Sequence, residues 1–462
     1  MKRWTLARGS ICSILLGLRG WKLSWPRRFS VAVNDVERVR FRNGISGLVT
    51  IDLHNVARAS SPDPLLIYLP PYSTAFSDGP VALPTFAQRR PTAVINYRWA
   101  GYYPFGNIAS RFTRSGRQFK KVLSWPTPLH DILKGYDWIK ENLGPDETRA
   151  RWDIYVYGSY LGASLATSLA LTETHFRTIQ QIGIRGCVAY NGIYNWTTFL
   201  PDHKINQASL HPPENTIEEV SEVSSEEPQF QELKQHMKAL FVKPDNLFDP
   251  FASSSLFFHP PGLYVPPNFN STALSPENPE DLERDPLEEP VGDPTLLPVD
   301  QPRFISEDPD LWPEDEDEDE DKPESSLGKK TEQMLTKPPN AGYYKYPPRW
   351  STLEIPEALL LYSSQSPLPA SLPQGLERPP KLEENNFKSH ASDLAKLMRR
   401  SINKIEMVER AKRGESVDIS EAARRVQLED VGLNPGGFEL GREGEELVGA
   451  WLEDQMDNSY PK

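Results

Sequence analysis

This chain of 462 residues is poor in cysteine and has no long apolar run. Its two cysteines, Cys12 and Cys187, cannot build a disulfide framework, and neither has the spacing of a metal site. No apolar stretch approaches the roughly 20 residues that a membrane helix needs, so we expect no membrane span. A glycine-rich phosphate loop and a dinucleotide fingerprint are also missing. We therefore expect no cofactor, no metal and no nucleic-acid-binding fold.

Acidic residues are absent from the first 34 positions, which carry seven Lys or Arg around the apolar run Ile11–Leu18. A basic, acid-free and amphipathic N-terminus is typical of a mitochondrial presequence. We therefore predict residues 1–34 to be a targeting segment and the protein to be mitochondrial. The alternatives are a secretory signal, or a plain basic tail on a cytoplasmic protein.

The acidity of the chain is concentrated in residues 201–340. The formal net charge is −13 overall but −22 in this segment, which also holds 22 of the 44 prolines. Residues 270–340 cannot bury enough apolar area to fold, so we predict a disordered acidic linker there. Residues 201–269 are less polar, and their helical spacing predicts a lid-like insert with a helix that carries Leu233, Met237, Leu240 and Phe241.

Eight consecutive acids, Glu314–Asp321, stand out within the linker. The simplest interpretation of this run is a solvated tether. The functional interpretation is an interaction tail for a basic protein partner.

Outside that segment, short apolar runs alternate with helical patterns. Residues 36–60 alternate around Asn43-Gly44, which predicts a hairpin. The runs 65–69, 93–97, 153–157, 187–190 and 358–362 predict buried strands, and 128–143, 386–428 and 443–456 predict helices. This order predicts an α/β fold with a mainly parallel sheet flanked by helices, built from residues 35–200 and 341–462.

The sequence Gly158-Ser159-Tyr160-Leu161-Gly162 lies between a predicted strand and a helix of small residues. Glycines at this spacing allow the tight turn from a strand to a helix that holds the nucleophile of many hydrolases. The central residue, which would carry the nucleophilic oxygen, is Tyr160. Ser159 lies one residue too early and should point away from such a site.

These segments resemble the α/β-hydrolase fold, in the branch of hormone-sensitive lipase and its microbial esterase relatives. Besides the turn at Tyr160, the resemblance rests on Asn96-Tyr97-Arg98-Trp99-Ala100 after a strand and on the helix Trp125–Asn142, with Pro128, Asp131 and Trp138. It covers residues 36–200 and 343–457, and it implies the fold and an esterase-like active site.

Each part of the site that the resemblance implies is substituted. The nucleophile position holds Tyr160, a weak nucleophile near neutral pH. The loop that should offer N–H groups to an oxyanion contains Pro70, Pro71 and Tyr72, and proline has no N–H. The acid position holds Ser366, and the histidine position holds Gly436. We therefore predict a catalytically degenerate pseudo-esterase.

The sequence leaves three functions open. The first is a binding or scaffold protein, with a small apolar ligand in a vestigial pocket of Trp99, Tyr102, Tyr103 and Phe105. The second is an active carboxylic-ester hydrolase in which Ser159 is an atypical nucleophile. The third is a structural subunit of a larger mitochondrial assembly.

Overall fold

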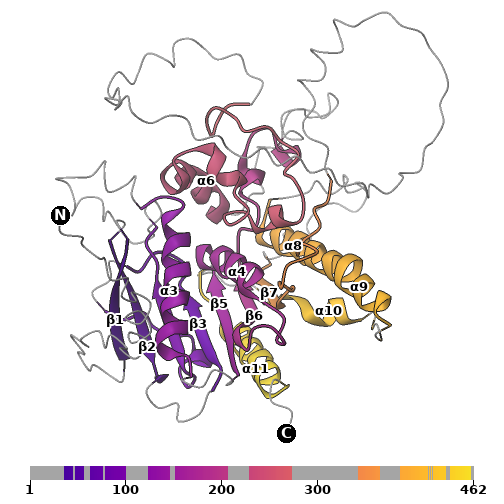
Figure 1. The fold of residues 1–462 in the computed structure, drawn as a ribbon. Helices are drawn as coiled ribbons and strands as arrows, with labels where there is room; N and C mark the ends of the chain where they lie inside the picture. The colour runs from indigo at the N-terminus through magenta and orange to yellow at the C-terminus, as the bar shows by residue number, and fades with distance from the viewer. Residues whose placement is uncertain are drawn as a thin grey trace, which may run out of the picture.

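The computed structural model describes eleven stretches of the chain and two single residues (Figure 1): residues 36–44, 47–56, 63–75, 79–99, 123–145, 151–206, 228–272, 342–364, 385–414, 416, 418, 420–432 and 438–458. The predicted presequence, nearly all of the predicted acidic linker, and Tyr102, Tyr103, Phe105, Ser366 and Gly436 lie outside these residues.

One eight-stranded sheet organises the described residues. Its strands follow the order β1-β2-β4-β3-β5-β6-β7-β8. Strand β2 is antiparallel to both β1 and β4, and all the other neighbours are parallel. The strands are β1 (Val36–Asn43), β2 (Gly47–His54), β3 (Leu65–Leu69), β4 (Thr92–Asn96), β5 (Trp152–Ser159), β6 (Ile182–Tyr190), β7 (Glu357–Tyr362) and β8 (Val426–Asp430).

Burial explains why the central runs are continuously apolar. Strands β3, β4 and β5 are buried along their whole length, because helices cover both faces of a parallel sheet. Strand β1 is half-exposed at the edge and pairs with β2 in the predicted hairpin, with Asn43 opposite Gly47. The predicted fold class is therefore confirmed: this mostly parallel sheet flanked by helices is an α/β-hydrolase fold.

The helices divide between the two faces (Figure 1). Helices α3 (Thr127–Leu143), α4 (Leu161–Glu173) and α8 (Phe387–Ser401) share one hydrophobic core with one face of the sheet. Helix α11 (Arg442–Asn458) and the short η3 (Thr85–Ala87) pack on the opposite face, in a second core around Tyr155, Tyr157 and Trp451.

The described residues 196–206 and 228–258 form a cap above α4 (Figure 1). The cap contains η4 (Trp196–Phe199), α6 (Pro228–Phe241), η5 (Pro244–Phe248) and η6 (Ser254–Phe257). The four apolar residues expected on one side of α6, from Leu233 to Phe241, are all buried. The cap is bonded to the body, because the Leu240 carbonyl accepts from Trp99 Nε1 at 3.0 Å and from the Trp125 N–H at 2.9 Å.

Two sequence-based expectations need correction. The helical pattern of 386–428 continues through the π-helical η8 (Ile402–Glu406), α9 (Met407–Lys412) and α10 (Glu421–Arg425), but Leu428 belongs to strand β8. Strand β8 has only five residues and follows α10 directly, so its period of two could not emerge. In α3, Thr127 is the first helical residue and Pro126 the cap, one position earlier than expected.

Candidate functional site

The turn between β5 and α4 has the backbone of a strained elbow. Tyr160 lies between the two elements with φ 55° and ψ −115°, a region that side-chain-bearing residues rarely occupy. A side chain on Gly158 would collide with the carbonyl of Gly162, and one on Gly162 would collide with the carbonyls of Leu69 and Pro70. Both glycines are therefore required by close approach of backbone to backbone.

The side chain of Tyr160 is completely buried, with 0% of its surface exposed. Its ring meets Phe438 edge to face at 4.9 Å between centroids, and it lies 6.0 Å from Phe387 at the start of α8. Phe438 in turn contacts Tyr72 edge to face at 6.3 Å. Rings from α8 and from the segment before α11 thus pack on the side chain at the place where the resemblance puts a nucleophile, and Tyr72 packs behind Phe438.

The loop after β3 turns carbonyl groups toward the elbow. The Leu161 N–H, which follows the nucleophile position, donates to the Pro71 carbonyl at 3.2 Å. The buried Pro70 carbonyl accepts from Tyr97 Oη at 2.8 Å. In α/β-hydrolases the N–H of the residue after the nucleophile stabilises the oxyanion. Here that donor is already engaged by the chain itself.

Ser159 lies on the other side of the sheet from this cluster. It is the last residue of β5. Tyr157 lies two residues before it and Tyr155 four residues before it, and both belong to the core under α11. Residues two apart in a strand point to the same face, so the Ser159 hydroxyl faces α11. The hydroxyl is fully buried, and none of its contacts with described residues has the full geometry of a hydrogen bond. It does interact electrostatically with the phenols of Tyr68 and Tyr157, whose pKa values burial raises well above the ordinary value.

The described ends of β6 and β7 are joined by a neutral pair. Asn191, at φ 49°, donates through Nδ2 to Ser363 Oγ at 2.9 Å and accepts from the Ser363 N–H at 2.9 Å. Ser366 follows a few residues later, and Gly436 follows β8, both outside the described residues. Ser366 as the acid position and Gly436 as the histidine position therefore remain predictions from the sequence.

The last histidine of the chain, His390, is a buried structural residue of α8. Tyr194 donates its N–H to Nδ1 at 3.3 Å, so the proton lies on Nε2 and is donated to Asn385 Oδ1 at 2.9 Å. Burial, together with the nearby His203, lowers the pKa of His390 to about 3. A neutral imidazole with both nitrogens engaged is a poor general base.

Of the proposed aromatic pocket, only Trp99 is described, and it is part of the core. Besides its bond to Leu240, its ring packs 5.7 Å from Trp125 and 5.6 Å from Phe241. The end of α6 therefore occupies the space beside Trp99.

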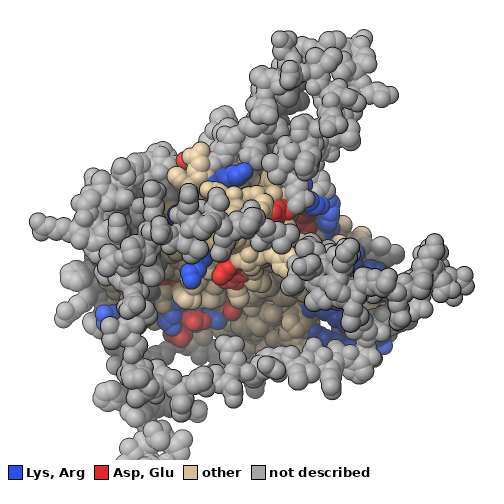
Figure 2. Space-filling model, turned by 90° about the horizontal axis from the view of Figure 1, so that it is seen from above, with Lys and Arg blue, Asp and Glu red and all other residues tan. Residues whose placement is uncertain are grey.

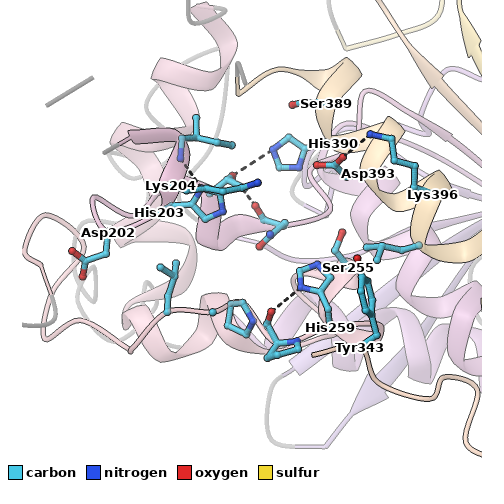
Figure 3. A pocket seen from close by; sticks show the side chains of 18 of the residues that line it. Asp202, His203, Lys204, Ser255, His259, Tyr343, Ser389, His390, Asp393 and Lys396 are labelled. Atoms are coloured by element: carbon cyan, nitrogen blue, oxygen red, sulfur yellow. Dashed lines mark hydrogen bonds and ion pairs between the residues drawn. The ribbon is translucent and has the colours of Figure 1, made fainter. Parts of the chain in front are cut away.

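A cavity of about 620 Å³ lies between the cap and α8 (Figure 3). Helix α8 supplies one wall, and the turn after η4 supplies the opposite wall with Asp202, His203 and Lys204. His259 and Tyr343 close a third side. Sequence reasoning missed this cavity, because its walls come from segments nearly 200 positions apart and no local motif links them.

Two kinds of site are not found in the part of the chain that the structure describes. No cluster of three or more His, Cys, Asp or Glu could hold a metal ion there. Nor is any helix among the described stretches long and apolar enough to span a membrane.

Comparison with known proteins gives similarity of fold only. No family model and no curated protein matches the chain. Among solved structures it is similar to an esterase of Pyrobaculum calidifontis, with 16% identity over 48% of this chain and 62% of that chain and a TM-score of 0.29. It is also similar to brefeldin A esterase, a bacterial homologue of human hormone-sensitive lipase, with 16% identity over 49% of this chain and 57% of that chain and a TM-score of 0.28. A fungal esterase from Rhizomucor miehei is similar with 10% identity over 93% of this chain and 85% of that chain and a TM-score of 0.38.

The first of these matches spans less than two thirds of the esterase it resembles. The order and the directions of the strands in the sheet identify the fold.

Proposed function

We propose that this protein is a catalytically inactive α/β-hydrolase-like protein that acts by binding, as a scaffold or carrier, rather than by hydrolysis. The observation that supports this most is the state of the elbow. Its central side chain, Tyr160, is enclosed by aromatic rings, and the following N–H of Leu161 is bonded to Pro71. An ester carbonyl would need a nucleophile and free N–H donors at this one point.

The chemistry of the surrounding side chains supports the same proposal. The hydroxyl of Ser159, one residue before the tip of the elbow, faces the opposite side of the sheet, toward α11. His390, which follows Phe387 on α8 by three residues, has both nitrogens engaged by Tyr194 and Asn385. General-base activation of a serine needs a histidine within hydrogen-bond reach.

The test is labelling of the purified full chain with a fluorophosphonate probe, followed by hydrolysis of short-chain p-nitrophenyl esters. We expect no labelled serine and no turnover above a blank. Tyr160→Ser should not gain activity, because the Leu161 N–H stays bonded to Pro71. Labelling or turnover that Ser159→Ala abolishes, while Ser164→Ala leaves it intact, would establish the esterase alternative. Ser164 is the matched control, since it lies on the other face of the sheet.

Mitochondrial location is part of this proposal and rests on the basic, acid-free N-terminus alone. A structural role in a larger assembly would show as co-sedimentation of the endogenous protein with a particle far heavier than its own 52.4 kDa. A free binding protein would stay in the light fractions.

A further inference from the structure

A row of cations runs along the exposed side of α8 and η8. Lys396, Arg400 and Lys404 are all exposed and four residues apart. Residues at this spacing lie on one side of a helix, and the three span about 12 Å along its axis. Figure 2 shows lysine and arginine side chains on this side of the molecule, at the right of the view. We call Lys396, Arg400 and Lys404 the cationic row.

The segment that leaves the predicted acidic linker runs directly beside the cationic row. The guanidinium of Arg400 lies 3.7 Å from the centre of the Tyr343 ring, and Ser401 Oγ donates to the Tyr346 carbonyl. The Tyr344 N–H donates to the Phe258 carbonyl at 2.7 Å, which fixes this segment against the cap. The described chain resumes at Gly342, directly before Tyr343, whose ring contacts Arg400 in the middle of the row.

The acids near the row do not neutralise it. Asp393 pairs with Lys396 at 3.3 Å, but both side chains are about 70% exposed, and such pairs contribute little. Glu406 is committed to Arg425 and to the Ile355 N–H, and Glu409 to Lys412. Within the described part of the chain, neither Arg400 nor Lys404 forms an ion pair. The row therefore presents three positive charges against one exposed carboxylate.

We propose that the acidic run Glu314–Asp321 of the same chain docks on the cationic row. The two are complementary in charge: the run has eight consecutive carboxylates, and the row has three cations, with Lys345 on the neighbouring segment. They are also tethered, because only 21 residues separate Asp321 from Tyr343. A flexible chain of that length has a root-mean-square span of about 25 Å, which gives an effective concentration in the millimolar range.

Because the acidic run is tethered to the row, its high effective concentration favours it over an external polyanion. An acidic protein or a nucleic acid at micromolar concentration would have to displace a run that is present at about a thousand times that concentration. The contact remains reversible, because exposed ion pairs weaken as the Debye length falls from about 10 Å at 0.1 M salt to about 3 Å at 1 M. The acidic run would therefore shield the row until a stronger or more concentrated polyanion competes for it.

Zero-length carbodiimide crosslinking of the dilute full-length protein, read by mass spectrometry, tests the contact directly. We expect amide links from carboxylates of 314–321 to Lys396 and Lys404 at 50 mM salt, reduced at least fivefold at 1 M salt. Lys134, exposed on α3, is the control lysine. Equal linkage to Lys134 and to the row would overturn the proposal. So would linkage that rises with protein concentration, because the occupant would then be a second copy.

Heparin affinity, a polyanion probe, gives an independent measurement. Replacing all eight acids of 314–321 with Asn or Gln should raise the eluting salt concentration well beyond a matched variant. That variant replaces the eight acids of residues 277–293, which lie in the same linker. Adding Lys396→Glu, Arg400→Glu and Lys404→Glu should abolish the difference between the two variants. Equal shifts in the two eight-acid variants would mean that net charge alone matters, and the docking proposal would fail.

Discussion

The ring of Tyr160 meets the ring of Phe438 edge to face, with the centroids 4.9 Å apart and the planes at 85°. One residue lies at the tip of the elbow, and the other lies just before α11, more than 270 positions later. Strained backbone persists where the surrounding structure over-determines it. Here the packed rings hold the elbow in place. Through Tyr160, the sheet packs against both α8 and the segment before α11.

Tyr160→Ala should therefore cost stability. Removing a fully buried aromatic ring typically destabilises a protein by about 3–5 kcal/mol. Urea unfolding followed by tryptophan fluorescence measures the change in the free energy of unfolding. Tyr344→Ala is the control, because Tyr344 is more than half exposed and its loss should cost less than about 0.5 kcal/mol. A cost below about 1 kcal/mol for Tyr160→Ala would mean that the ring does not hold the elbow.

Asp131→Ala should be equally costly for an electrostatic reason. Asp131, fully buried on α3, accepts from Arg98 Nη2 at 2.6 Å, from Arg98 Nε at 2.8 Å and from Asn43 Nδ2 at 2.8 Å. Removing it strands a buried guanidinium, which typically costs about 3–5 kcal/mol.

The control for this prediction is Asp137→Ala on the same helix. Asp137 is half-exposed and pairs with Lys140 at 3.5 Å, so Asp137→Ala should lower the free energy of unfolding by less than about 1 kcal/mol. Replacing Arg98 and Asp131 together with Met and Leu should cost less than Asp131→Ala alone. A double variant that is worse than the single one would contradict this explanation.

The sequence predicted the fold better than the site, for physical reasons. The run Leu65–Leu69 carries a local signal, because a fully buried strand is continuously apolar. Gly158 and Gly162 carry another, because their spacing is that of a tight turn from a strand to a helix. The bond from the Leu161 N–H to Pro71 joins residues 90 positions apart, and no local pattern encodes it. The same holds for His390, whose partners Tyr194 and Asn385 come from different segments.

Residues 1–34 should carry a fused fluorescent protein into mitochondria. Import depends on positive charge along an amphipathic, acid-free segment. Arg3→Glu, Arg8→Glu and Arg19→Glu together should abolish co-localisation with a mitochondrial dye. Arg3→Lys, Arg8→Lys and Arg19→Lys together form the control, because they keep the charge. Secretion of the fusion would show instead that the segment is a signal peptide.

His390 should make the protein less stable as the pH falls below neutrality. Its pKa is about 3 in the folded protein, against an ordinary value of 6.5. Between these values the unfolded chain binds a proton that the folded protein does not, so the free energy of unfolding falls as the pH falls. From pH 7 to pH 5 the loss is about 2 kcal/mol for this one group.

His390→Gln isolates that contribution, because glutamine is neutral at every pH used. Urea unfolding at pH 7 and pH 5 should show a smaller loss for the variant than for the wild type. His130→Gln, at an exposed position of α3, should keep the wild-type difference. Parallel pH profiles for the wild type and His390→Gln would mean that the imidazole titrates normally in the folded protein.

Glu357 should act in the opposite direction over an overlapping range. It is the first residue of β7, and no described group hydrogen-bonds its Oε2. Burial raises its pKa from an ordinary 4.5 to about 7, although Arg425 and Arg424 pull it down. Between these values the unfolded chain releases a proton that the folded protein keeps. Its contribution to stability is therefore complete below pH 4.5 and is lost as the pH rises through 7.

Glu357→Gln removes that titration while it keeps the shape of the side chain. The stability of the variant relative to the wild type should rise from pH 4.5 to pH 7, by up to about 1.4 kcal/mol per pH unit. Glu429→Gln, exposed on the neighbouring strand β8, should show no such rise. If the relative stability of Glu357→Gln instead falls over this range, the carboxylate is charged in the folded protein and Arg425 outweighs burial.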